Sequence, residues 1–178
     1  ARPLCGRIEG PRSTGSDDSW VASLAQERAA CEKLIAGVRA HEPLLHADLD
    51  ENSKYCVFGY VLALASRHQT SISVLDYGGN LGDYSWIGKA LVPGVELEFH
   101  CKELPAIAAA GRELTPEIVW HTDDTCLQAS YDLVMFSSSL QYLPDWKTIL
   151  QQAAQHTRHS LLLSDVPSVR RVPTFVIT

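Results

Sequence analysis

Long apolar runs are missing from this sequence, as are the paired cysteines and histidines of a metal site. No apolar run approaches the ~20 residues that a membrane helix needs. The five cysteines are widely spaced and form no C-x-x-C pair, which argues against a disulfide framework and a zinc site. The seven histidines show no H-x-x-x-H spacing. We therefore expect no metal, and reduced thiols in a cytoplasmic protein.

Basic residues are also in short supply. Lys and Arg total 15 against 21 Asp and Glu, a net charge of -6. This balance argues against a nucleic-acid partner, whose phosphates require basic contacts, and against an anionic membrane surface. With 178 residues, 46% hydrophobic and 20% charged, the chain has the composition of one globular domain.

Three regions follow from the distribution of residues along the chain. Residues 1–16 are rich in Pro, Gly and Ser, which predicts a mobile leader. Residues 17–70 form an expected helical N-terminal extension, with helices over 17–39 and 54–67 and a break at Pro43. Residues 71–178 form the expected core.

In the core, short apolar strands alternate with helical segments. The expected strands are 72–76, 95–101, 117–121, 131–136 and 160–163, and the expected helices are 83–91, 105–114 and 146–156. Such alternation predicts βαβ units. The fold class is therefore α/β, with a Rossmann-like, doubly wound and mostly parallel sheet.

A glycine-rich turn, Asp76-Tyr-Gly-Gly-Asn-Leu-Gly82, follows the first strand. Ligands of open α/β sheets bind at this end of the strands. The dinucleotide fingerprint G-x-G-x-x-G is missing because Gly78 and Gly79 are adjacent. Asp76 would also repel a pyrophosphate, whereas it suits a cationic ligand such as S-adenosylmethionine. A tight turn that binds no ligand is the alternative.

Residues 74–82 resemble motif I of the class I S-adenosylmethionine-dependent methyltransferases. Asp76, Gly78 and Gly82 match the motif, and Asn80 replaces its middle glycine. The resemblance narrows to a bacterial group of methyltransferase-like proteins linked to surface-polysaccharide gene clusters. Further matches to that group lie at residues 103–105, 111–113 and 137–143.

The resemblance implies roles for named residues in binding the cofactor. Asp76, Gly78, Gly79 and Gly82 would hold its methionine end, and Asp123 its adenine. Ser137 and Gln141 would contact the cofactor, with Tyr142 at the border of the acceptor.

Glu103 is the expected partner of the cofactor ribose. It lies 21 residues after Gly82 and follows the second strand, where a Rossmann-like site needs an acid. Simpler alternatives remain open: Glu103 as a carboxylate at a helix start, Asp123 as part of a polar loop, and residues 137–139 as a serine-rich turn.

The predicted activity is transfer of a methyl group from S-adenosylmethionine to a small or glycan-like acceptor (EC 2.1.1 type). Two alternatives are an inactive methyltransferase-like binding or scaffold protein and a nucleotide-binding oxidoreductase. A serine nucleophile is not indicated, because G-x-S-x-G is absent. The sequence identifies no general base or other catalytic residue.

The resemblance also bears on the ends of the core. A class I sheet has two further strands after its fifth, and only residues 172–178 could supply one here. We therefore expect the C-terminal strands to be missing from this chain and its gene product to run past Thr178. An open sheet edge would offer a route to a homo-oligomer. The N-terminal helices, with Tyr55 and Tyr60, are expected at the acceptor wall.

Overall fold

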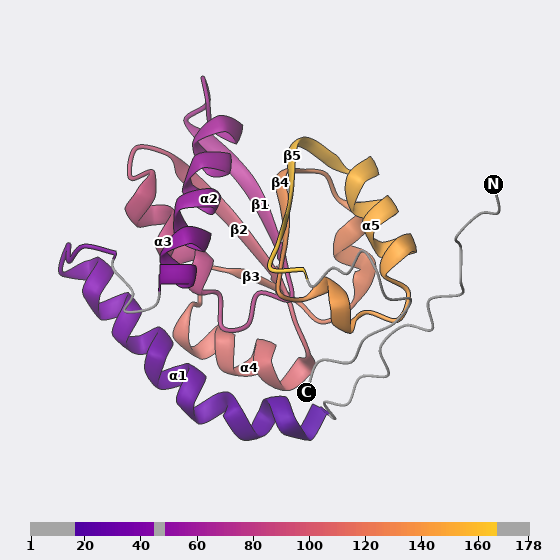
Figure 1. The fold of residues 1–178 in the computed structure, drawn as a ribbon, viewed down its shortest axis with the longest axis horizontal. Helices are drawn as coiled ribbons and strands as arrows, with labels where there is room; N and C mark the ends of the chain where they lie inside the picture. Colours follow the sequence, from indigo (N-terminus) through magenta and orange to yellow (C-terminus); the bar gives the residue numbers. More distant parts are fainter. Residues whose placement is uncertain (1–16, 45–48, 167–178) are drawn as a thin grey trace.

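A computed structural model describes residues 17–44 and 49–166 (Figure 1). The described chain folds into one five-stranded sheet with helices around it. Its elements are α1 (Asp17–Arg39), α2 (Leu49–Ala65), β1 (Ser71–Tyr77), α3 (Asp83–Leu91), β2 (Glu96–Lys102), α4 (Pro105–Leu114), β3 (Val119–His121), the 3-10 helix η1 (Asp124–Gln128), β4 (Tyr131–Ser137), the 3-10 helix η2 (Leu140–Tyr142), α5 (Trp146–Gln155) and β5 (Thr157–Ser164).

The strand order is β3-β2-β1-β4-β5, and every pairing among the described strands is parallel. This confirms the predicted α/β class and Rossmann-like sheet. β1 and β4 are buried over nearly their whole length, as expected for apolar strands covered on both faces. The order reverses between β1 and β4, so the crevice at their carboxyl ends is where a doubly wound sheet binds its ligand.

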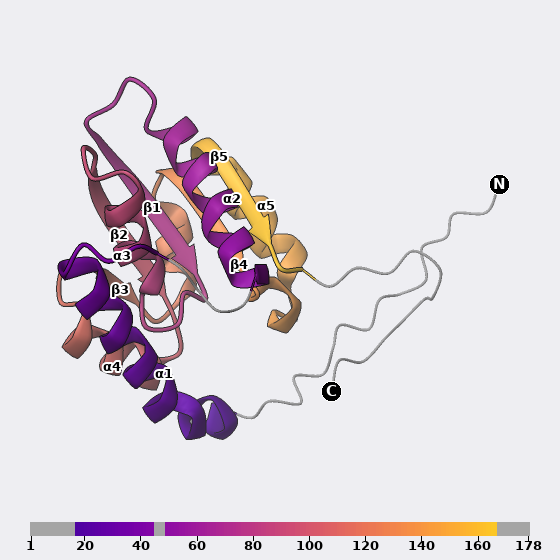
Figure 2. The ribbon, with the colours of Figure 1, turned by 60° about the vertical axis from the view of Figure 1, so that its left-hand side comes forward.

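Helices cover both faces of this sheet. Phe58 and Leu62 of α2, Ile87 of α3 and Ala108 of α4 form one core with the sheet. Ile149 and Ala153 of α5 pack with η1 on the other face. α1 lies outside α3 and α4 (Figure 1), where Cys31 is part of a third buried cluster. Figure 2 shows α2 beside β5.

Some element boundaries differ from the sequence prediction. α2 begins at Leu49 rather than residue 54, and β5 begins at Thr157 rather than residue 160. Asp124–Gln128 forms a 3-10 helix where a polar loop was expected. The predicted leader, 1–16, and the strand-like segment 172–178 lie outside the described residues. Within the described chain, β5 pairs with β4 alone.

A buried carboxylate joins three strands near their amino ends. Asp132 of β4 accepts hydrogen bonds from the backbone N–H of Ser73 at 2.8 Å and from the Ser73 hydroxyl at 3.0 Å. The Arg158 guanidinium of β5 donates from Nε at 2.7 Å. These bonds, with that from Arg158 the strongest, hold the pKa of Asp132 well below its usual value.

We predict that Asp132→Asn lowers the free energy of unfolding by about 1.5–3 kcal/mol at pH 7, the range for hydrogen bonds to a charged group. The native pKa is depressed, so this stabilisation is present above the pKa of the unfolded state and is lost as pH falls through the native pKa. Urea unfolding of both proteins should therefore show a gap that narrows below about pH 4.

Glu32→Gln is the control, because Glu32 forms an exposed i,i+4 ion pair with Arg28. Such a pair contributes at most about 0.5 kcal/mol. Equal stability of Asp132→Asn and wild type at pH 7 would show that Asp132 does not join the strands energetically.

Candidate functional site

A cavity of about 180 Å³ opens where the carboxyl ends of β1 and β4 meet. It is lined by Lys54, Asp76, Gly78, Gly79, Asn80, Asp83, Tyr84, Ser137 and Ser138. Four of the residues predicted from the sequence to bind a cofactor, Asp76, Gly78, Gly79 and Ser137, thus line one cavity. It lies between β1 and β4, at the switch point of the sheet, where the strand order reverses.

Asp76 is the second-last residue of β1 and is 0% exposed. Neither carboxylate oxygen has a hydrogen-bond partner among the described residues. Burial is the main cause that raises its pKa to about 8, and the charges of Glu103 and Asp83 add to the effect. An ionised Asp76 therefore needs a cation beside it.

The turn after β1 begins with two adjacent glycines because the backbone there lies very close to neighbouring side chains. Gly78 has a φ of 80°, and a Cβ there would lie 2.4 Å from Cβ of Ser139. A Cβ on Gly79 would lie 2.5 Å from Oδ2 of Asp76 and 2.8 Å from Sγ of Cys101. The missing side chain of Gly79 thus lets the backbone lie directly over the Asp76 carboxylate.

Asn80 ties the glycine turn to two other elements. Its backbone N–H donates to Oε1 of Glu103 at 3.1 Å, and its Nδ2 donates to Oε2 of Glu27, on α1, at 3.0 Å. Its φ is 51°, a left-handed conformation that asparagine tolerates better than most residues. Asn80 therefore has a structural role in place of the expected glycine.

Glu103 faces this turn from the end of β2. Its Oε2 accepts the N–H of Leu104 at 2.7 Å, so two backbone bonds fix the carboxylate. Burial raises its pKa, while the same two bonds oppose the rise. Each oxygen has about two acceptor positions, so both keep one for a ligand hydroxyl.

The two adjacent acids after β3 have different partners. Asp123 is exposed and caps η1, accepting the N–H of Thr125 at 3.0 Å and the Thr125 hydroxyl; these bonds lower its pKa. Asp124 instead accepts the hydroxyl of buried Tyr77 at 2.5 Å. Both carboxylates are exposed, but Asp123 caps η1 and Asp124 is the hydrogen-bond partner of β1.

Ser137 is the last residue of β4 and Gln141 lies after it, and the two side chains have different partners. The Ser137 and Tyr84 hydroxyl oxygens are 3.3 Å apart at the cavity wall. Nε2 of Gln141 donates to the carbonyl of Ser138 at 2.8 Å, and its buried Oε1 has no partner in the described chain. Gln141 is not among the residues that line the cavity.

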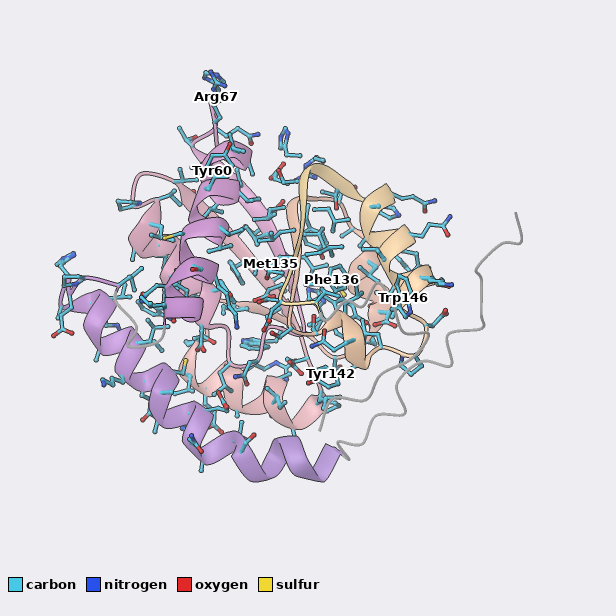
Figure 3. The ribbon with its side chains drawn as sticks, in the orientation of Figure 1. Tyr60, Arg67, Met135, Phe136, Tyr142 and Trp146 are labelled. Atoms are coloured by element: carbon cyan, nitrogen blue, oxygen red, sulfur yellow. The ribbon has the colours of Figure 1, made fainter. Side chains whose placement is uncertain are left out.

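Lys54, Asp83, Tyr84 and Ser138 line the cavity but were not predicted from the sequence. Lys54 forms an ion pair with Asp165 at 3.0 Å, and Ser138 also hydrogen-bonds to Asp165. Tyr60, in contrast, is 67% exposed near the Arg67 end of α2 (Figure 3) and does not line the cavity. No local motif marks Lys54, which reaches the site only through the packing of α2.

Similar folds occur among solved structures. An O-methyltransferase family protein from Burkholderia thailandensis matches with a TM-score of 0.53 and 18% identity, over 82% of this chain and 43% of its own. A Listeria monocytogenes protein assigned to the class I S-adenosylmethionine-dependent methyltransferases matches with 0.52 and 15%, over 76% and 53%. The chain has a Rossmann-like methyltransferase fold.

A third methyltransferase fold, that of the plantazolicin methyltransferase BpumL, was solved with S-adenosylhomocysteine and a desmethylPZN analog. It matches with a TM-score of 0.50 and 11% identity, over 78% of this chain and 61% of its own. The chain thus spans 43–61% of the length of these three proteins. No protein-family model and no curated protein matches its sequence.

Neither a metal-binding cluster nor a membrane-spanning helix is present among the described residues. No cluster of three or more His, Cys, Asp or Glu residues in 17–44 and 49–166 could hold a metal ion. Among the described helices, none has the length and apolar character needed to cross a membrane.

We predict that Gly79→Ala destabilises the protein by about 1–3 kcal/mol, the usual cost of an added methyl group in a packed site. The methyl group would displace Asp76 or Cys101, whose atoms lie within 3 Å of it. Gly94→Ala is the matched control, because a Cβ there meets nothing within 4 Å. Denaturant unfolding of the two variants should separate them; equal stability would contradict the close packing of the turn.

Proposed function

We propose that this protein is an S-adenosylmethionine-dependent methyltransferase (EC 2.1.1 type) that acts on a small or glycan-like acceptor. The observation that carries the proposal is Asp76, a fully buried carboxylate without a hydrogen-bond partner in the described chain, beside a cavity at the switch point. A buried unpaired carboxylate is costly, and a cationic ligand relieves that cost. S-adenosylmethionine carries an ammonium and a sulfonium group.

The residues around the cavity fit such a cofactor. In the proposed site, Asp76 and the turn of Gly78, Gly79 and Gly82 hold the methionine end. Glu103 accepts the ribose hydroxyls, which is supported by its orientation through two backbone N–H groups. Asp123 would meet the adenine, since it is exposed beside β3 and ionised at neutral pH.

Ser137 and Gln141 complete the proposed set. Ser137 is supported by its position in the cavity wall. The buried Oε1 of Gln141, which has no partner within the described residues, could accept one donor from the bound cofactor after a small movement of the side chain.

The cofactor supplies an electrophilic methyl group on a sulfonium, and the protein's part is to orient the acceptor and exclude water. Positioning of this kind provides much of the rate of such a transfer. Tyr84 and Ser137 contribute hydroxyl groups to the cavity, and Lys54 contributes a cation. A polar acceptor, rich in hydroxyl groups, matches this lining.

The remaining parts of the proposal rest on the sequence, and only the bacterial group comes from the resemblance. They are a bacterial, cytoplasmic enzyme of the group linked to surface-polysaccharide gene clusters, an N-terminal extension over residues 17–70 and a core over 71–178. A homo-oligomer through the edge of β5 belongs to the same proposal.

The electrostatics of the cavity favour this proposal over a nucleotide-binding oxidoreductase. Asp76 would face the pyrophosphate of a dinucleotide, and Asp83 adds a second carboxylate to the same cavity. Two buried acids beside a dianionic group are strongly unfavourable. An inactive scaffold protein would have the same fold, but it would have no need of a cationic ligand at Asp76, and the unpaired carboxylate there would then have no function.

We predict that S-adenosylhomocysteine raises the melting temperature and that NAD does not. A ligand at 100 times its dissociation constant stabilises the folded state by about 2.7 kcal/mol, which a thermal-shift assay detects readily. A folded protein with no shift at millimolar S-adenosylhomocysteine would refute the methyltransferase proposal. A shift with NAD alone would favour the oxidoreductase.

A further inference from the structure

The cavity beside Asp76 contains a second acid, Asp83, to which neither the motif nor the fold assigns a role. Asp83 is the first residue of α3 and directly follows Gly82. Its side chain lines the same cavity as that of Asp76. Its Oδ1 is buried and has no hydrogen-bond partner among the described residues.

A residue of α1 lies next to the Asp83 side chain. The thiol of Cys31, which is only 1% exposed, lies beside the Asp83 carboxylate and donates a long hydrogen bond to the carbonyl of Leu81 at 4.0 Å. Burial raises the pKa of Asp83, and the nearby charge of Glu27 adds to this rise. A single thiol is a weak donor, so this carboxylate lacks the charged or backbone donors that normally accompany burial.

Together the two acids present three buried acceptor oxygens without donors: Oδ1 and Oδ2 of Asp76 and Oδ1 of Asp83. The charge of Asp83 also acts on Asp76 and adds to the rise of its pKa, after burial and the charge of Glu103. A primary ammonium carries three N–H donors and one positive charge. It satisfies both the hydrogen-bonding and the electrostatic requirement of the pair, whereas a water molecule offers two donors and no charge.

We propose that Asp83 is the second carboxylate of an ammonium-binding subsite that it shares with Asp76. The ligand class is a molecule with a primary ammonium group. This inference rests on the proposed function, in which that group is the α-ammonium of S-adenosylmethionine. Cys31 is a positioning residue, since it reaches the subsite only through Asp83.

A purely structural Asp83 would behave differently. An acid in the first turn of a helix stabilises that helix through its dipole, whatever ligand is bound. Removing such an acid would lower the affinity of all ligands of the cavity by the same factor. A direct contact with the ammonium group affects only ligands that carry it.

The experiment is a calorimetric titration of wild type and Asp83→Asn with two ligands. One is S-adenosylhomocysteine, and the other is its deaminated analogue, in which hydrogen replaces the α-amino group. Asp83→Asn should lower the affinity for S-adenosylhomocysteine by roughly tenfold or more, which is the effect of losing a hydrogen bond to a charged group. The affinity for the analogue should not change. Asp145→Asn, an exposed acid at the start of α5, is the matched control and should change neither affinity.

Each other outcome has a definite meaning. If Asp83→Asn weakens the binding of both ligands equally, or of neither, the subsite proposal is wrong. The proposed function still stands in that case, provided that wild type binds S-adenosylhomocysteine. Failure of folded wild type to bind S-adenosylhomocysteine would overturn the proposed function and, with it, the subsite. If Asp83→Asn does not fold, Asp83→Ser is titrated in its place, with the same expected results.

Discussion

The desolvated carboxylate of Asp76 is the constraint on which the site depends. β1 lies in the middle of the sheet because Ile72 to Tyr77 is buried, and this position carries Asp76 away from water. The chain then turns directly over the carboxylate, which is sterically open only because residue 79 has no side chain. A buried negative charge at this point is favourable only beside a cation, which is the basis for proposing a cationic ligand here.

The fold could be predicted from the sequence where strands are buried along nearly their whole length. β1 and β4 are apolar runs because helices cover both of their faces, and the alternation of strands and helices identifies a parallel sheet. The start of β5 was not readable, because Thr157 and Arg158 are polar. Their strand conformation depends on Asp132, which lies 26 residues earlier in the chain and binds Arg158 across the sheet.

The candidate site could be predicted where its residues are neighbours in the sequence. Asp76, Gly78 and Gly79 form one local motif at the cavity, and Glu103, predicted from its spacing along the chain, lies against the same turn. Lys54 and Ser138 come from α2 and the end of β4, so only the packing of the chain brings them to one cavity. Asp123 and Asp124 are neighbours of the same type, and their distinct partners depend on the position of Tyr77.

The proton balance of ligand binding tests the role of Asp76 most directly. Titration with S-adenosylhomocysteine at pH 7, in two buffers of different ionisation enthalpy, counts the protons released. Because the pKa of Asp76 is raised to about 8, the free carboxyl is mostly protonated at this pH and must ionise to pair with an ammonium group. The account predicts release of about one proton per ligand from wild type, and much less from Asp76→Asn. Tight binding to wild type without proton release, or the same release from both proteins, would contradict it.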